Sequence, residues 1–147
     1  MEEAAGVLLK NRLLGVVGID AQSSVKRVIA GTDINRFMVS VTGFQRGGIA
    51  FGFLQEDRPG SIKALTDIFR SCGGRLASIL TSCQGAPRGY RKMHIRVRGL
   101  DRLKSGELQE ALAQNATLLY GIDQRFNKRE LFPEAMEHAE TLAKKLR

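Results

Sequence analysis

The fold is decided by residues 49–74, which read IAFGFLQEDRPGSIKALTDIFRSCGG. An apolar strand runs into the tetrapeptide Asp57-Arg58-Pro59-Gly60, and a helix follows at once. In that helix the apolar residues recur at helical spacing, namely Ile62, Leu65, Ile68, Phe69 and Cys72. Pro59 suits the first helical turn, and the carboxylate of Asp57 is expected to accept hydrogen bonds from the first N–H groups. Gly73-Gly74 is expected to end the helix, because glycine tolerates the left-handed conformation found there.

The pattern continues with strand, strand, helix and strand. Residues 76–82 are rich in β-branched and apolar side chains, and a turn follows over residues 84–89. Tyr90 to Arg98 alternates strictly, with apolar residues on one face and polar residues on the other. Residues 104–114 show helical spacing, and Thr117 to Ile122 completes the order βαββαβ. This order predicts an α+β fold, a ferredoxin-like split βαβ sandwich with two helices on one face of an antiparallel sheet.

Three features of this region carry a family resemblance: the Asp57-Arg58-Pro59-Gly60 turn, Gly73-Gly74 with the strand after it, and the alternating third strand. Through them, residues 48–123 resemble an ACT domain, the ligand-sensing module of many enzymes and regulators of amino-acid metabolism. We expect the domain to cover residues 47–125. The resemblance implies a regulatory, non-catalytic function in which a small metabolite is sensed, most plausibly an amino acid.

The resemblance also implies where the ligand binds. Two chains would associate as a homodimer, or as a higher homo-oligomer, and the ligand would lie between them. The backbone N–H groups at the start of the helix would take its carboxylate, and Gly60 would let the backbone approach closely. The expected ligand-binding residues are Asp57, Arg58, Pro59, Gly60 and Ser61 from one chain, with Ser78, Ile79 and Leu80 from the other. The alternative is a structural dimerisation module that binds no small molecule.

Residues 1–43 resemble the later part of one CBS motif. The pattern predicts a helix over Glu2–Asn11, a strand over Leu13–Asp20, a second strand over Ser24–Ala30 and a second helix that opens near Thr32. Asp33 matches the acidic residue that binds ribose hydroxyls in nucleotide-binding CBS motifs. Thr32 and Asp33 are therefore the candidates for a less favoured function, adenine-nucleotide binding.

Several departures from the CBS pattern favour a docking or dimerisation segment instead. Val17 stands where the usual proline would be, Ala30 replaces the usual threonine, and the partner motif is absent. The combination resembles the C-terminal half of bacterial CBS–ACT proteins, some of which carry acetoin-utilisation labels. It suggests either a shortened gene or a piece of a longer protein.

Positive charge is concentrated in one part of the chain. Lysines and arginines number 23 against 15 acidic residues, which gives a net charge of +8. The excess lies between Arg88 and Lys104, where Lys92, Arg96 and Arg98 share one face of the alternating strand. Such a face suits a phosphate-bearing ligand or nucleic acid, or acidic residues of another domain, or it is simply solvated.

RNA-recognition domains use the same βαββαβ order and are the main rival among binding modules. They need aromatic residues on the two central strands. Here the third strand offers only Tyr90 and His94, and the outward set of the first strand, Ala50, Gly52 and Leu54, offers no stacking surface. Nucleic acid is therefore not the expected partner.

The sequence does not predict an enzyme. His94 and His138 have neither a nucleophile nor a carboxylate placed near them by spacing, and no glycine-rich phosphate loop is present. Cys72 and Cys83 have neither metal-site nor redox-pair spacing, so no metal and no cofactor is expected. No apolar run is long enough for a membrane helix, and a reduced, cytoplasmic protein is expected. Residues 126–147 are expected to form a helical tail with an amphipathic helix from Pro133 to Leu146.

Overall fold

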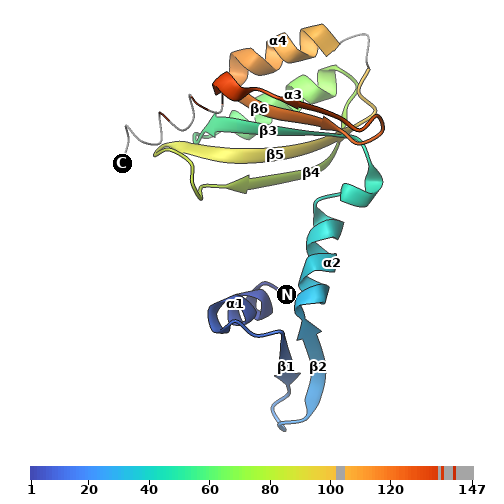
Figure 1. Cartoon of the computed structure of the whole chain (residues 1–147), viewed down its shortest axis with the longest axis vertical. Coiled ribbons are helices and arrows are strands. Elements are labelled where there is room, and N and C mark those ends of the chain that lie inside the picture. The colour runs from blue at the N-terminus through green and yellow to red at the C-terminus, as the bar shows by residue number, and fades with distance from the viewer. Residues whose placement is uncertain (102–104, 136, 138–140, 142–147) are drawn as a thin grey trace. The chain divides into compact units, whose positions relative to one another are not determined.

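The computed structural model describes residues 1–101, 105–135, 137 and 141. The chain divides into two compact units, Met1–Gln45 and Arg46–Arg147 (Figure 1). Each unit has its own sheet. The boundary falls close to the glycine pair Gly47-Gly48, both of which have positive φ angles.

The larger unit contains the predicted order βαββαβ. Its elements are β3 (Ile49–Glu56), α3 (Ser61–Ser71), β4 (Arg75–Ser82), β5 (Tyr90–Arg98), α4 (Ser105–Asn115), β6 (Thr117–Asp123) and β7 (Lys128–Leu131). The five strands lie in the order β4-β5-β3-β6-β7, and every neighbouring pair is antiparallel. Without β7, the sheet order β4-β5-β3-β6 is that of a split βαβ unit. The predicted α+β fold is therefore confirmed.

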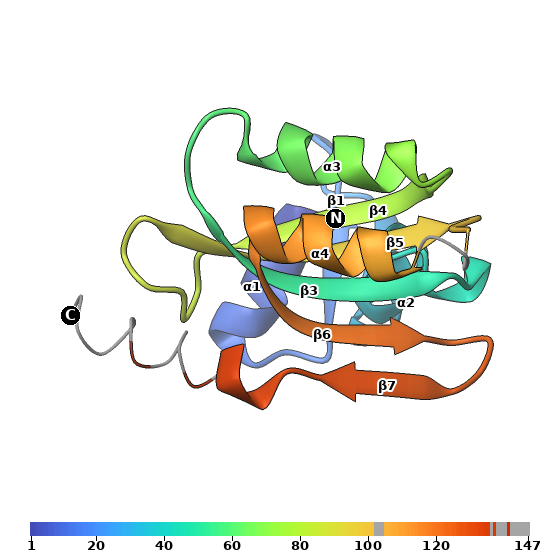
Figure 2. The ribbon, with the colours of Figure 1, turned by 90° about the horizontal axis from the view of Figure 1, so that it is seen from above.

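Both helices lie on the same face of the sheet, and the core fills the space between them and the strands (Figures 1 and 2). The rings of Phe51 and Phe53 contact Phe69 of α3, with centroids 5.1 and 6.2 Å apart. On β5, Met93, Ile95 and Val97 are each at most 2% exposed, so the inward face predicted from the alternation is confirmed. The opposite face of the sheet carries the alternate residues of β5, namely Tyr90, Lys92, His94, Arg96 and Arg98.

Strand β7 was not expected. Residues 126–147 were predicted to be a helical tail, but Lys128–Leu131 pairs with β6 and widens the sheet by one strand. Asn127, with φ of 50°, closes the turn between them. A four-residue strand with three charged side chains has no apolar alternation, which is why its sequence gave no strand signal. The predicted amphipathic helix falls mostly on residues outside the described part; residues 133–135 are helical.

The smaller unit has the elements predicted for it. They are α1 (Glu2–Asn11), β1 (Gly15–Ile19), β2 (Val25–Ala30) and α2 (Gly31–Val41), and the two strands form an antiparallel hairpin. Leu8 is the one large apolar side chain of this unit that is buried. Leu9 and Leu14 are more than four-fifths exposed, and residues on both strands and on α2 are also exposed. A two-stranded hairpin with so small a core is marginal alone, so this unit is expected to gain stability from a covering surface.

Gly74 tests how tightly α3 is packed onto the sheet. A Cβ atom at Gly74 would lie 2.6 Å from Cγ1 of Val97 and 2.7 Å from the carbonyl oxygen of Phe69. Gly74→Ala is therefore expected to lower the free energy of unfolding of the larger unit by about 1–3 kcal/mol, as other overpacked cores do. Gly121→Ala is the control, because its Cβ would meet only Phe51 ring atoms at 3.9 Å. Urea unfolding measures both variants, and an equal loss of unfolding free energy in Gly74→Ala and Gly121→Ala would contradict the tight packing at Gly74.

Candidate functional site

The loop between β3 and α3 gathers the first group of predicted ligand-binding residues. Asp57, Arg58, Pro59, Gly60 and Ser61 line a hollow of about 320 Å³, together with Ile62 and Arg91. The loop is held to the start of β5 by a hydrogen bond from the N–H of Asp57 to the carbonyl of Gly89, 2.8 Å long. The structure therefore brings these five residues together at one end of the sheet.

Asp57 does not have the role expected of it. Its carboxylate pairs with the guanidinium of Arg91, and no side chain caps α3. The helix begins at Ser61, so Pro59 lies in the preceding turn and not in the first helical turn. A bond between two charged groups is stronger than one to a neutral amide, and β5 supplies that charged partner in the folded chain.

The start of α3 retains unpaired amides because of this arrangement. The N–H of Ser61 donates to the carbonyl of Arg58 and that of Ala64 to Gly60, while within the described structure the amides of Ile62 and Lys63 donate to nothing. The hydroxyl of Ser61 also donates to the Arg58 carbonyl, at 2.9 Å, so it closes the turn. Two free amides at the positive end of a helix form a site for an anion.

Gly60 is required first by the backbone. Its φ angle is 86°, in the left-handed region that side chains disfavour, and a Cβ atom there would meet nothing within 4 Å. A side chain at position 60 would therefore meet open space at its Cβ atom, at a residue that lines the hollow. Arg58 is exposed and forms an ion pair of 3.1 Å with Glu56.

Ser78, Ile79 and Leu80 do not line this hollow in the same chain. They lie in the middle of β4, opposite Arg96, Ile95 and His94 respectively. Because successive residues of a strand point to opposite faces, Ser78 and Leu80 share the face without helices, whereas Ile79 lies on the other. Ile79 is still 37% exposed, since β4 is the edge of the sheet. Their contribution to a site formed with a second chain stays a prediction.

In the smaller unit, Asp33 stabilises the start of α2. Its Oδ2 accepts from the N–H of Ala30 at 3.0 Å, and its Oδ1 accepts from Arg36 at 3.1 Å. Thr32 is exposed beside it. Both carboxylate oxygens thus already accept a hydrogen bond within the unit, and adenine-nucleotide binding at Thr32 and Asp33 stays a prediction.

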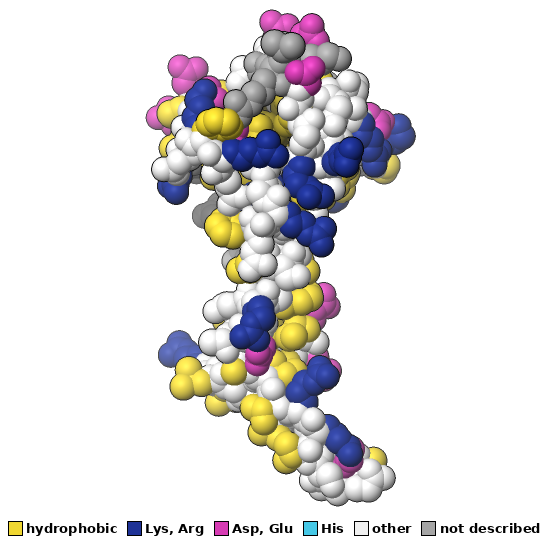
Figure 3. Space-filling model, turned by 90° about the vertical axis from the view of Figure 1, so that its right-hand side faces the viewer, with side chains coloured by type: hydrophobic (Ala, Val, Ile, Leu, Met, Phe, Trp, Pro, Cys, Tyr) yellow, Lys and Arg dark blue, Asp and Glu magenta, His cyan; other side chains and the backbone are white. Residues whose placement is uncertain are grey.

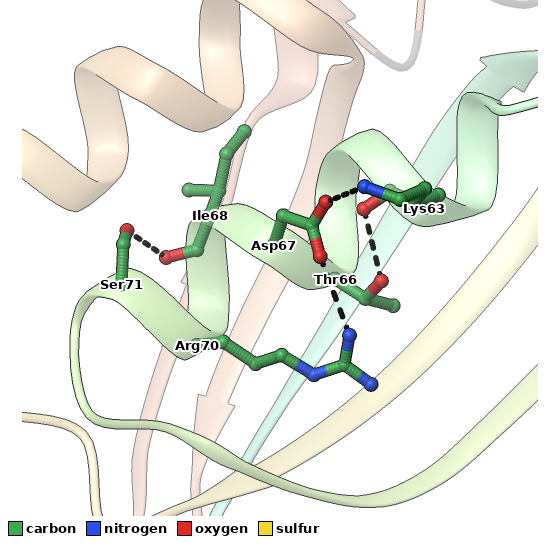
Figure 4. A network of polar contacts seen from close by, with 6 residues as sticks. All are labelled: Lys63, Thr66, Asp67, Ile68, Arg70 and Ser71. Carbon is green, nitrogen blue, oxygen red and sulfur yellow. Dashed lines mark hydrogen bonds and ion pairs between the residues drawn. The ribbon is translucent and has the colours of Figure 1, made fainter.

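The ion pairs of α3 balance a part of the positive charge in the larger unit. Asp67 accepts from Lys63 and from Arg70 on the exposed side of the helix (Figure 4). The bond from Lys63 is the main cause that lowers the pKa of the Asp67 carboxyl below its ordinary value. Figure 4 also shows the hydroxyl of Thr66 donating to the Lys63 carbonyl and that of Ser71 to the Ile68 carbonyl.

A second polar group lies on the sheet face that the helices leave open, and the sequence did not reveal it. Tyr120 of β6 stands opposite Gly52, and a Cβ atom on Gly52 would lie 2.2 Å from the Tyr120 ring. The ring therefore lies directly over the glycine. Its hydroxyl bonds to Nδ1 of His94 at 2.9 Å, and Arg96 donates to Gln124 at 2.8 Å. The signal available in the sequence was a lone glycine inside an apolar strand, which marks a close approach.

Burial changes the protonation of this group. It lowers the pKa of the His94 imidazole below its ordinary value of 6.5, and the positive charge of Arg96 lowers it further. Burial also raises the pKa of the Tyr120 hydroxyl, against the opposing effect of Arg96. The two side chains thus form a neutral hydrogen-bonded pair at neutral pH.

No protein-family model matches the chain, and no curated protein matches it significantly. In the described residues no helix is long and apolar enough to cross a lipid bilayer. Within that same part of the chain no group of three His, Cys, Asp or Glu side chains is placed to hold a metal ion. The geometry of the loop and of the sheet therefore carries the functional argument.

His94 gives a pH prediction with a definite sign. Its folded pKa lies below the unfolded value of 6.5, so the unfolded chain binds more protons as the pH falls through that value. The stabilising contribution of neutral His94 is therefore fully present above about pH 6.5, and it is lost progressively as the pH falls from there towards the lower, folded pKa. Urea unfolding at several pH values is expected to show a steeper loss for the wild type than for His94→Gln. If the unfolding free energies of the wild type and of His94→Gln fell equally with pH, His94 would not be the group responsible.

Proposed function

We propose that this chain is a non-catalytic regulatory module of the ferredoxin-like ACT type, which senses an amino acid at an interface between two chains. The observation that carries the proposal is the uncapped start of α3. There, the amides of Ile62 and Lys63 have no acceptor within the described structure, and Ile62 lines the hollow together with Asp57 to Ser61. A carboxylate placed in the hollow would accept from both amides and meet the positive end of the helix dipole.

A buried polar atom on β3, on a residue that pairs in register with Arg91 but does not itself line the hollow, suits the other charged group of an amino acid. Gln55 stands opposite Arg91 in the sheet register, and Arg91 lines the hollow. The Oε1 atom of Gln55 is buried, and it has no hydrogen-bond partner in the described structure. A ligand ammonium that reached it would satisfy an acceptor that is otherwise costly to bury.

The edges of the sheet support association through β4. Strand β7 is short and carries Lys128, Arg129 and Glu130, which protects its edge from pairing. Strand β4 is eight residues long, contains a single charged residue, Arg75, and pairs only with β5. A long apolar edge of this kind is a template for a strand of another chain, so a second copy pairing along β4 would place Ser78 to Leu80 at the interface.

The ligand is tested by thermal unfolding of the whole chain against each of the common amino acids. A ligand that binds only the folded state raises the midpoint with its concentration. Gly60→Asp would place a competing carboxylate at the helix start, whereas Gly60→Asn has nearly the same shape and the same tolerance of a left-handed backbone. We expect Gly60→Asp to abolish the shift and Gly60→Asn to retain a part of it.

Two results would count against this function. An amino-acid shift that is unchanged in Gly60→Asp would mean that the ligand binds elsewhere. No shift with any amino acid, in a protein that sedimentation shows to be dimeric and that Ile79→Lys converts to monomers, would instead support the structural dimerisation module.

A further inference from the structure

The open face of the sheet in the larger unit collects positive charge from three strands that are distant in sequence. The register places Arg96, Ala50, Ile122 and Arg129 in one row across β5, β3, β6 and β7. Lys92 and Arg98 flank Arg96 along β5, and Arg75 of β4 stands directly opposite Arg98. The accessible cations of this face are therefore Arg75, Lys92, Arg98 and Arg129, around the buried Arg96.

These four cations differ from four other basic residues of the unit, each of which has an acidic partner. Lys63 and Arg70 of α3, Arg58 and Arg91 all form ion pairs with acidic residues. Within the described part of the chain, none of the four has an ion pair. On the described strands the acidic residue of this face is Glu56, at one end of β3, and Arg58 already pairs with it.

The register that places Arg75 directly opposite Arg98 lowers the stability of the folded sheet unless something compensates for it. Like charges directly opposite each other on neighbouring strands destabilise a sheet. The Nε atom of Arg98 is also buried without a hydrogen-bond partner in the described structure. An anion bound between the two guanidinium groups would remove the repulsion. Figure 3 shows several Lys and Arg side chains on the surface of this unit that faces the viewer.

Two rings lie at the centre of this basic face. His94 and Tyr120 are half-buried, with ring centroids 6.2 Å apart and planes inclined by 44°. The sequence suggested no stacking surface on β3, because Gly52 has no side chain. In the folded sheet that glycine instead lets the Tyr120 ring from the neighbouring strand cover β3. Rings surrounded by cations are the combination by which sheets bind the bases and phosphates of single strands.

The size and charge of the face limit what can cover it. Lys92 and Arg98 lie about 20 Å apart along β5, at about 3.4 Å per residue, which is too far for one phosphate group. A second copy of the same face would bring like charges together. We propose that the open face of β4-β5-β3-β6-β7 binds single-stranded nucleic acid, with phosphates on Arg75, Lys92, Arg98 and Arg129 and bases against Tyr120 and His94.

The test uses the full chain at several salt concentrations and measures the fluorescence anisotropy of a labelled single-stranded RNA. The RNA has about 12 nucleotides, which is within the range of site sizes of single-strand-binding OB folds. Four phosphate contacts predict a slope of about −2.8 in log affinity against log salt, or about 50-fold weaker binding at about 200 mM than at about 50 mM. The double variant Arg75→Gln, Arg98→Gln is expected to reduce the slope to about −1.4, or about 7-fold.

Matched controls separate this face from general positive charge. Lys128 and Arg129 are adjacent and exposed on β7, but only Arg129 lies on the open face. Arg129→Gln should weaken binding and lower the slope, whereas Lys128→Gln should change neither. Tyr120→Leu should weaken binding at least about fivefold through loss of stacking, whereas Tyr120→Phe, which keeps the ring, should not. The unfolding midpoint of each variant reports whether it remains folded.

Three outcomes would overturn the proposal. The first is no binding of the RNA at about 50 mM salt. The second is an equal loss of affinity in Lys128→Gln and Arg129→Gln, which would indicate general charge. The third is that duplex RNA or polyglutamate competes as well as single strands, with no effect of Tyr120→Leu, which would indicate an acidic protein or another polyanion. Each is independent of the Gly60 variants, which leave this face unchanged.

Discussion

The larger unit depends on the burial of β3 on both of its faces. Phe51 and Phe53 pack under α3, and Ala50 and Leu54 are covered on the opposite face, so each of these side chains is at most 8% exposed. A strand buried in this way must be paired on both sides, and β5 and β6 supply those pairs. The positions of α3, α4 and the remaining strands follow from that central strand.

The same constraint creates the loop site. When β3 ends at Glu56, the chain must reverse from the sheet to the helix layer within four residues, and Gly60 makes the reversal in a left-handed conformation. The turn leaves α3 without a side-chain cap, because Asp57 is drawn to Arg91 on β5. The free amides that suit an anionic ligand are thus a consequence of how β3 is connected.

The two faces of the sheet differ in the kinds of side chain that they carry. The covered face holds the apolar core, and on the outer side of α3 the basic residues Lys63 and Arg70 are paired with Asp67. The open face carries cations without such pairs around Tyr120 and His94. One fold can therefore present a small-ligand site at the end of a helix and a separate surface for an extended anion.

The sequence by itself determined the kind and order of the elements. The helical spacing after Gly60, the alternation from Tyr90 to Arg98 and the glycines at 73–74 are local signals, because each reports which side of one element is buried. They also identified the loop at Asp57 to Ser61. The short charged strand at 128–131 carries no such signal, and it was missed.

Only the tertiary structure decided which side chains meet across elements. The pairing of Asp57 with Arg91, the ring of Tyr120 over Gly52 and the opposition of Arg75 to Arg98 all depend on strand order and register. Strand register is fixed by long-range burial, and a shift of one residue would move every side chain to the other face. Contacts of this kind have no local pattern, which is the physical reason why the chain showed them only when folded.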